Sequence, residues 1–118
     1  MPAAYREIGQ PVIIGGSMET GSALLLGTAA AMAETFGSTA HGAGRTMSRH
    51  EAKRRVKGPK LLADMAARGI VVRARSSWGV AEEARFAYKD LDAVVDVLEQ
   101  PDSPHRVATL SPIGNIKG

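Results

Sequence analysis

Residues 11–26 read PVIIGGSMETGSALLL, which places a short β-branched run directly before a glycine-rich turn. The run from Pro11 to Ile14 predicts a strand that ends in a tight turn at Gly15-Gly16. The turn extends to Ser22. The apolar residues from Ala23 to Leu26 are too few to show a period, so they fit a strand or the start of a helix, and we favour the strand.

Five helices are predicted downstream from capping residues, helix formers and stop signals. Thr28, Ser48 and Asp90 have side-chain oxygens that can cap a first helical turn. Ser48 together with Glu51 matches the capping box, in which both side chains bind free amides. The clearest amphipathic helix follows Asp90, where leucine and valine recur at helical spacing. The predicted helices cover residues 29–36 before a stop at Gly37, 49–57, 58–68, 81–88 and 91–100 before Pro101.

Two further strands and a C-terminal tail complete the prediction. Ile70 to Ala74 predicts a strand that is interior at its start, because its apolar residues are consecutive. Arg106 to Leu110 alternates in polarity and predicts the last strand. The remaining tail, residues 113–118, is expected to dock because it carries the apolar Ile113 and Ile116.

Length and composition favour one cytoplasmic domain. The chain has 118 residues, with 44% hydrophobic but only 4% aromatic side chains, so its core must be built from aliphatic residues and alanine. The sequence contains no cysteine, which excludes disulfides and thiolate metal sites and fits a reducing compartment. It also shows neither a signal peptide nor a membrane span. We therefore expect a single α+β domain over residues 1–118, located in the cytoplasm.

Basic residues are concentrated in one part of the chain. The net charge is +3, but residues 45–60 hold seven basic residues against one acid, whereas residues 82–102 hold seven acids. Phosphate contacts by such a basic segment would release counterions and strengthen RNA binding at low salt. A solvated helix face explains the same cluster equally well, because no aromatic residues are interleaved. The candidates for binding RNA phosphates are Arg49, Lys53, Arg54 and Lys57.

The segment GSTAHGAGRT, residues 37–46, is the strongest candidate for chemistry. Its three glycines predict an exposed or site-lining loop that leaves the His41 imidazole reachable. An imidazole is a competent nucleophile at phosphorus near neutral pH, and Arg45 could grip a phosphate with two N–H groups. This pattern suits phosphoryl or nucleotidyl transfer, although a lone loop histidine more often has no chemical role.

Other features carry weaker signals. The glycines at residues 15–16 could let backbone amides approach a ligand, but a plain turn explains them as well. Trp78 and Tyr88 could stack on bases, with packing in or near the core as the more common role for Trp78. The three histidines lack the spacing of metal ligands on a helix. Lys117 is either a free tail charge or part of a functional terminus.

Four motifs in a fixed order support a family resemblance. They are HGAGRxxSR at residues 41–49, IVVR at 70–73, EEAxxAYKD at 82–90 and PIxxIKG at 112–118. In order and spacing they resemble the RtcB family of RNA ligases, over about residues 9–118. The resemblance implies GTP- and manganese-dependent joining of a 2′,3′-cyclic phosphate or 3′-phosphate RNA end to a 5′-hydroxyl end, as in tRNA splicing and RNA repair.

The resemblance also implies roles for individual residues. His41 would attack the α-phosphate of GTP and form a histidine–GMP phosphoramidate, which activates the RNA 3′-phosphate before the 5′-hydroxyl displaces GMP. Residues 42–44 would hold the phosphate and ribose, and Tyr88 and Lys117 would contact guanine. The full set implied for the nucleotide site, besides His41, is Gly15, Gly16, Ser17, Met18, Ser22, Gly42, Ala43, Gly44, Arg45, Tyr88 and Lys117.

The chain departs from the family pattern at several positions. Glu19 stands where glycine is usual, and its carboxylate could weaken GTP binding by repulsion. The other departures are Gly15 for proline, Ala23-Leu24 for Ser-Tyr and Ala40 for a common cysteine.

The resemblance implies that the manganese ligands lie outside this chain. In the family an Asp, a Cys and several His in the N-terminal part bind manganese, so no metal site is expected here. We therefore expect the C-terminal, guanylate-binding portion of the ligase, which needs a separate N-terminal segment as its partner to join RNA. The alternative is a non-catalytic RNA-binding or interaction remnant of the family.

Overall fold

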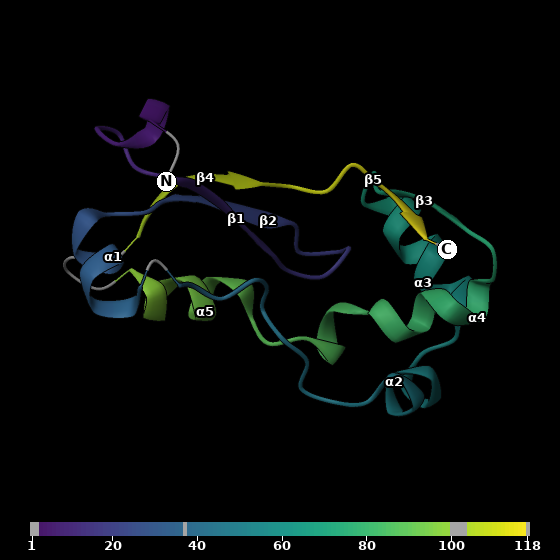
Figure 1. Ribbon diagram of the computed structural model, residues 1–118. Helices are drawn as coiled ribbons and strands as arrows, with labels where there is room; N and C mark the ends of the chain where they lie inside the picture. Colours follow the sequence, from purple (N-terminus) through teal and green to yellow (C-terminus); the bar gives the residue numbers. More distant parts are fainter. Residues whose placement is uncertain (1–2, 37, 100–103, 118) are drawn as a thin grey trace.

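Two small sheets and a set of short helices lie along an elongated molecule of 47 × 25 × 21 Å (Figure 1). The computed structural model describes residues 3–36, 38–99 and 104–117. The strands are β1 (Pro11–Gly15), β2 (Ser22–Leu26), β3 (Val71–Ala74), β4 (His105–Leu110) and β5 (Gly114–Lys117). The helices are α1 (Ala29–Thr35), α2 (Arg49–Arg55), α3 (Gly58–Ala67), α4 (Ser77–Val80) and α5 (Leu91–Leu98), with 3₁₀ turns η1 (Ala3–Tyr5), η2 (Ala81–Glu83) and η3 (Arg85–Ala87). This mixture confirms the predicted α+β class.

The larger sheet has the order β1-β2-β4, with both pairs antiparallel. Residues 23–26 therefore form a strand, as favoured, because β2 is paired on both sides. Helix α5 lies along one face of this sheet (Figure 1). Ile14, Leu25 and Val95 are fully buried there, together with Ala43 from the loop before α2. This first core therefore fixes the position of the loop that holds His41.

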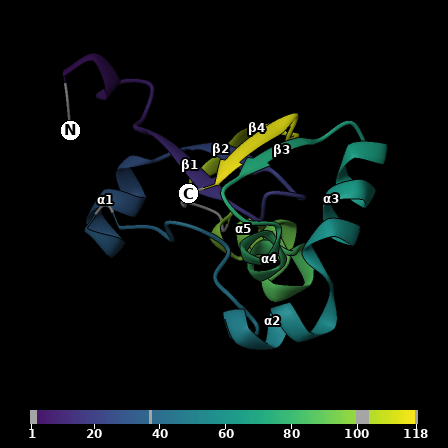
Figure 2. The ribbon, with the colours of Figure 1, turned by 90° about the vertical axis from the view of Figure 1, so that its right-hand side faces the viewer.

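The smaller sheet pairs β3 with β5 in parallel at the other end of the molecule. Beside it lies a second core, formed by buried residues that include Met18, Leu61, Met65 and Val80. Figure 2 shows this end with α4 between α2 and the two strands. Gly58 at the start of α3 allows the close approach of α4, because a Cβ there would lie 1.5 Å from the Ser77 carbonyl oxygen.

The predicted N-caps are confirmed. Thr28, Ser48 and Asp90 each accept a bond of 3.1 Å from a first-turn amide of α1, α2 and α5. The capping box is only half formed, because the Glu51 carboxylate accepts a hydrogen bond from Arg55. The expected helix stops at Gly37 and Pro101 lie outside the described residues.

Two predicted elements were wrong. The strand that starts at Ile70 is not interior: Ile70 is buried, but β3 has one strand neighbour and Val71 is exposed. Residues 81–88 do not form an α-helix, because the extended backbone at Ala84 separates two 3₁₀ turns. Ala81, Ala84 and Ala87 are all fully buried, because the two turns pack against the neighbouring helices α2 and α4.

The C-terminal tail docks, but not for the predicted reason. Residues 114–117 form β5, so β4 is not the last strand. Ile113 and Ile116 are 82% and 90% exposed, so they do not anchor the tail. The tail is attached by the ladder with β3, by a 3.0 Å bond from the Val71 amide to the Ile113 carbonyl, and by the Asn115 side chain. Backbone hydrogen bonding therefore positions Lys117.

Candidate functional site

A cavity of about 410 Å³ lies between the turn after β1 and the C-terminal strand. Its wall brings together predicted nucleotide-site residues that lie about a hundred positions apart in the chain. From the turn come Gly16, Ser17, Met18 and Ser22, and from the C-terminus comes Lys117. Glu83, which the sequence reasoning missed, also lines the cavity, as do Gly21 and residues 110–115.

The turn after β1 is held in shape by its own hydroxyl groups. Ser17 is buried, and its amide donates a 2.9 Å bond to the Thr20 hydroxyl. Its own hydroxyl lies 3.0 Å from that of Thr20 and accepts from the amides of residues 19 and 20. Gly16 fits because a Cβ there would lie 2.7 Å from the Thr20 hydroxyl. Ser17 thus shapes the cavity wall, and its hydroxyl is occupied within the turn.

Glu19, the charged departure in this turn, has its charge compensated. Its side chain is only 6% exposed and forms an ion pair with Arg68. It also accepts a 2.6 Å hydrogen bond from the amide of Arg85, at the start of η3. The carboxylate therefore connects the turn to α3 and η3, and these partners offset the repulsion expected toward a nucleotide.

The loop with His41 is attached to the same turn through the main chain. The Ala43 amide donates a 2.8 Å bond to the Gly15 carbonyl, and Gly42 pairs with Gly15 in a parallel bridge. A Cβ on Gly42 would lie 3.2 Å from that carbonyl oxygen, so glycine permits the approach. His41 is exposed, as predicted, and is not among the residues that line the 410 Å³ cavity.

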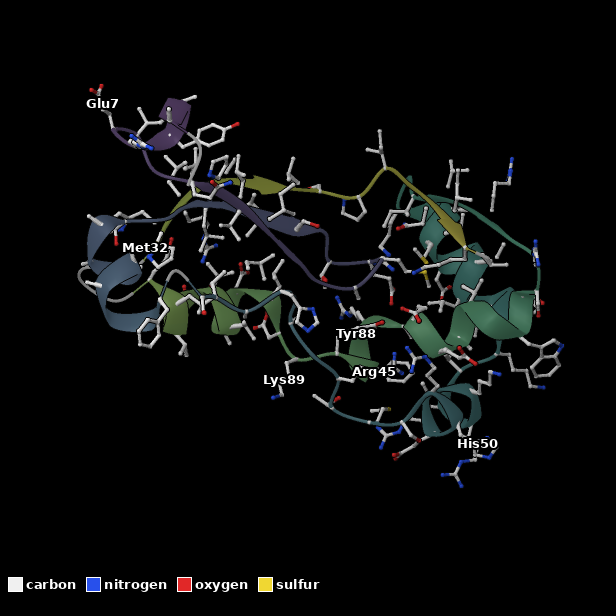
Figure 3. The ribbon with its side chains drawn as sticks, in the orientation of Figure 1. Glu7, Met32, Arg45, His50, Tyr88 and Lys89 are labelled. Carbon is white, nitrogen blue, oxygen red and sulfur yellow. The ribbon has the colours of Figure 1, made fainter. Side chains whose placement is uncertain are left out.

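Arg45 lies at the far end of this loop, against Tyr88 (Figure 3). The centre of its guanidinium is 4.9 Å from the Tyr88 ring centroid. Nη2 donates to the Glu82 carbonyl at 2.7 Å, and Nε donates to the Met47 carbonyl at 3.2 Å. Nη1 is buried and has no acceptor among the described residues. The guanidinium is therefore held by the protein and has one enclosed N–H without a partner among those residues, and the predicted phosphate contact stays a prediction.

Glu83 joins the two residues that were predicted to contact guanine. Its Oε2 accepts from the Tyr88 hydroxyl and lies 3.6 Å from Lys117 Nζ. Burial acts to raise the pKa of Glu83, but the Tyr88 hydrogen bond and the charges of Lys117 and Arg45 outweigh it and lower the pKa. Burial, the Glu83 hydrogen bond and the Glu83 charge raise the pKa of Tyr88. Glu83 is therefore an anion at neutral pH.

The sequence contained a signal for Glu83 that was not used. Glu83 lies in the motif EEAxxAYKD, from which only Tyr88 was taken as a site residue. Tyr88 itself lines a neighbouring hollow with Thr20 and Lys89. It contacts the 410 Å³ cavity only through its bond to Glu83.

The basic candidates on and after α2 fall into two groups. Lys53 Nζ lies 2.7 Å and Arg49 Nε 3.9 Å from the Glu82 carboxylate, so both charges are partly compensated. Arg54 and Lys57 are exposed. Trp78 is 61% exposed, so the packing role thought more common for it is wrong.

Over residues 3–36, 38–99 and 104–117, no group of three or more His, Asp or Glu side chains is arranged to hold a metal ion. In the same part of the chain, every helix is too short or too polar to cross a membrane.

Comparison with known proteins identifies the family. The model of the family described as tRNA-splicing ligase RtcB matches residues 1–118. The chain is 52% identical to the tRNA-splicing ligase RtcB of Pyrococcus furiosus and 49% identical to that of Thermococcus kodakarensis, over its full length in both cases. It is 47% identical to the RNA-splicing ligase RtcB of Mycobacterium bovis, again over its full length. It spans 12%, 24% and 27% of the length of these three relatives. The chain therefore belongs to the RtcB family.

Proposed function

We propose that this chain is the guanylate-accepting portion of an RtcB-type RNA ligase. It would take GMP from GTP onto His41 and pass it to an RNA 3′-phosphate, which is then joined to a 5′-hydroxyl end. The substrates would be tRNA halves or other broken RNA in the cytoplasm. Membership of the family supports the ligase reaction, and the geometry around Gly15 supports the guanylate step.

One observation carries this proposal. The 2.8 Å bond from the Ala43 amide to the Gly15 carbonyl joins the His41 loop to the turn that lines the cavity. A nucleotide bound along that turn would have its phosphates near the loop, while its base could occupy the cavity. Glycines at 42 and 44 keep the loop narrow, and the φ of +76° at Gly44 is strained for other residues.

The proposed chemistry is the one that the family resemblance implies. An imidazole nitrogen of His41 attacks the α-phosphorus of GTP, so a P–N bond forms, the bond to the β-phosphate oxygen breaks, and pyrophosphate leaves. An oxygen of the RNA 3′-phosphate then attacks the same phosphorus and breaks the P–N bond. Finally the 5′-hydroxyl attacks the RNA 3′-phosphorus, a phosphodiester forms, and GMP leaves. The positive charge of Arg45 would stabilise the negative charge during these steps.

Manganese, which the resemblance implies, does not fit the described residues, because they form no metal-ligand cluster. We propose that the ligands come from a separate N-terminal RtcB segment, and that this chain alone joins no RNA. The exposed Arg54 and Lys57 are then the candidates for contact with RNA phosphates.

The test is incubation with α-labelled GTP and manganese, with and without a supplied N-terminal RtcB segment. Acid-labile label on the wild-type chain that requires the segment is expected. His41→Ala should abolish it, because the P–N bond needs the imidazole. His50→Ala is the matched control, since His50 is exposed and points outward from α2 (Figure 3). Label that survives His41→Ala would contradict the proposal.

The competing function is RNA binding without catalysis. It predicts no label under any condition, but RNA affinity that falls steeply with salt and is unchanged by His41→Ala. Absence of label from a folded chain, with the segment demonstrably associated, would favour it.

A further inference from the structure

Trp78, the single tryptophan of the chain, has a side chain that lies largely in solvent. The residue is 61% exposed, although tryptophan is highly buried on average. The main chain beneath it is held in place, because the Ser76 hydroxyl accepts from the amides of residues 78 and 79 and because Val80 and Ala81 are fully buried. The indole is therefore an apolar ring on a fixed base, and the proposed chemistry at His41 does not use it.

Basic residues lie next to the helix that holds this ring. Trp78 belongs to α4, at the end of the molecule opposite α1 (Figure 1). The main chain of Gly58 packs against the start of α4, since a Cβ there would lie 3.1 Å from the Trp78 nitrogen. Lys57 and Lys60, on either side of this contact, are therefore close to α4, and Arg75 directly precedes its N-cap. All three cations are exposed.

The charges of Lys57, Lys60 and Arg75 are not compensated by the protein. Among the residues that the structure describes, none of the three forms an ion pair. Residues 49–60 and 73–78 contain one acid, Glu51, and its carboxylate pairs with Arg55. The surface around Trp78 is therefore positively charged and complements an anionic partner.

The combination of an exposed ring and free cations fits one kind of partner. Lysine is depleted at protein–protein interfaces, so the lysines beside Trp78 disfavour a protein as the occupant. Single-stranded RNA uses both features, because its bases stack on aromatic rings and its phosphates contact cations. A base pair inside a duplex cannot stack on a ring in this way, since its faces are already covered by the neighbouring pairs.

We propose that Trp78 stacks on an unpaired base of single-stranded RNA, and that Lys57, Lys60 and Arg75 contact the phosphates beside that base. The inference rests on the RNA binding in the proposed function and adds a contact outside the nucleotide site. The exposed Arg54 on α2 extends the same basic surface. The contact has little sequence preference, because every base has a face that can stack.

The test uses the fluorescence of Trp78, which reports on this site alone because the chain has no other tryptophan. The purified chain is titrated with single-stranded oligouridine about ten nucleotides long, with excitation at the red edge of the indole band, where RNA absorbs little. Stacking of a base on the indole should quench the emission. Double-stranded RNA of the same length should leave the emission largely unchanged, because it offers no unpaired base.

Filter binding of the same oligouridine gives a second readout. Trp78→Ala should weaken binding by roughly 5- to 100-fold, with an unchanged salt dependence because stacking releases no counterions. Trp78→Phe should retain most of the affinity, since it keeps an aromatic face. Phe36→Ala is the matched control, because it removes an exposed ring at the C-cap of α1, at the other end of the molecule, and should bind like the wild type (Figure 1). Thermal unfolding of each variant checks that the fold is retained.

The outcomes separate this inference from the proposed function. If RNA binds without quenching the emission, or if Trp78→Ala binds oligouridine as tightly as the wild type, the stacking role is overturned while RNA binding stands. If the emission responds to a supplied N-terminal RtcB segment but not to RNA, the surface is a protein interface and the inference is overturned. If the chain binds no RNA with or without that segment, the RNA binding of the proposed function fails, and the inference fails with it.

Discussion

The side-chain amide of Asn115 donates a 3.1 Å hydrogen bond to the main-chain carbonyl of Met18. The bond joins the C-terminal strand to the turn after β1, across 97 positions of the chain. Met18 is buried in the second core, so the bond also attaches the C-terminal wall of the cavity to that core. The two walls of the cavity are therefore fixed to each other by a side chain that the sequence reasoning did not select.

This bond gives the first prediction. Asn115→Ala should lower the free energy of unfolding by about 1 kcal/mol, because a partly buried carbonyl loses its donor. It should also weaken GMP binding, since Lys117 is two residues away on the same strand. Urea denaturation and dialysis measure the two effects. Ile116→Ala, at a side chain 90% exposed, is the control, and an equal loss in both variants would contradict the assignment.

Glu19 gives the second prediction. Glu19→Ala should destabilise the chain by about 1–3 kcal/mol, because Arg68 and the Arg85 amide lose a nearly buried acceptor. Chemical denaturation measures this, with the exposed Glu7→Ala as the control. Glu19→Ala should bring no gain in GMP affinity. Tighter binding would show instead that the carboxylate repels the nucleotide.

RNA binding gives the third prediction. The slope of log affinity against log salt should shrink by about 1 in Arg54→Gln, if the exposed Arg54 neutralises one phosphate. Lys53→Gln should change the slope less, because Glu82 already holds its ammonium at 2.7 Å. Filter binding of single-stranded RNA at several salt concentrations compares the two. Equal changes would mean that the ion pair opens at no cost when RNA binds.

The fourth prediction concerns pH. The pKa of Glu83 is lowered in the folded chain, so its contribution to stability is present above its ordinary value of 4.5 and is lost as pH falls through the lower folded pKa. The pKa of Tyr88 is raised, so its contribution is present below its ordinary value of 10.0 and is lost as pH rises through the higher folded pKa. The midpoint of thermal unfolding should be higher in the wild type than in Glu83→Gln at neutral pH. This difference between the two midpoints should therefore become smaller at acidic pH. A difference that is constant from neutral pH to pH 3 would refute this role.

Local signals in the sequence predicted much of the fold. The caps at Thr28, Ser48 and Asp90 were found because a hydroxyl or carboxylate before a helix acts on amides only two or three residues away. The elements that were predicted wrongly depend on contacts with distant parts of the chain. Residues 81–88 look helical by propensity, but Ala84 is extended, and the turns on either side of it pack against α2 and α4.

In the candidate site, too, local signals could be recognised from the sequence and contacts between distant residues could not. The residues at 41–45 were identified from a motif and those at 15–18 from the family resemblance, and the structure brings the two segments together through Gly15. Glu83 lies in a recognised motif, but its pairing with Lys117, like that of Asn115 with Met18, joins residues far apart in the chain. No local pattern of charge or hydropathy specifies those pairings.

The way β5 is attached has a consequence for variation in this chain. Its hold on β3 comes from main-chain groups, while the side chains of Ile113 and Ile116 face away from the core. Attachment of the terminus is thus independent of the residue type at these two positions. Polar replacements there should be tolerated and should improve solubility, while Lys117 keeps its place beside the cavity.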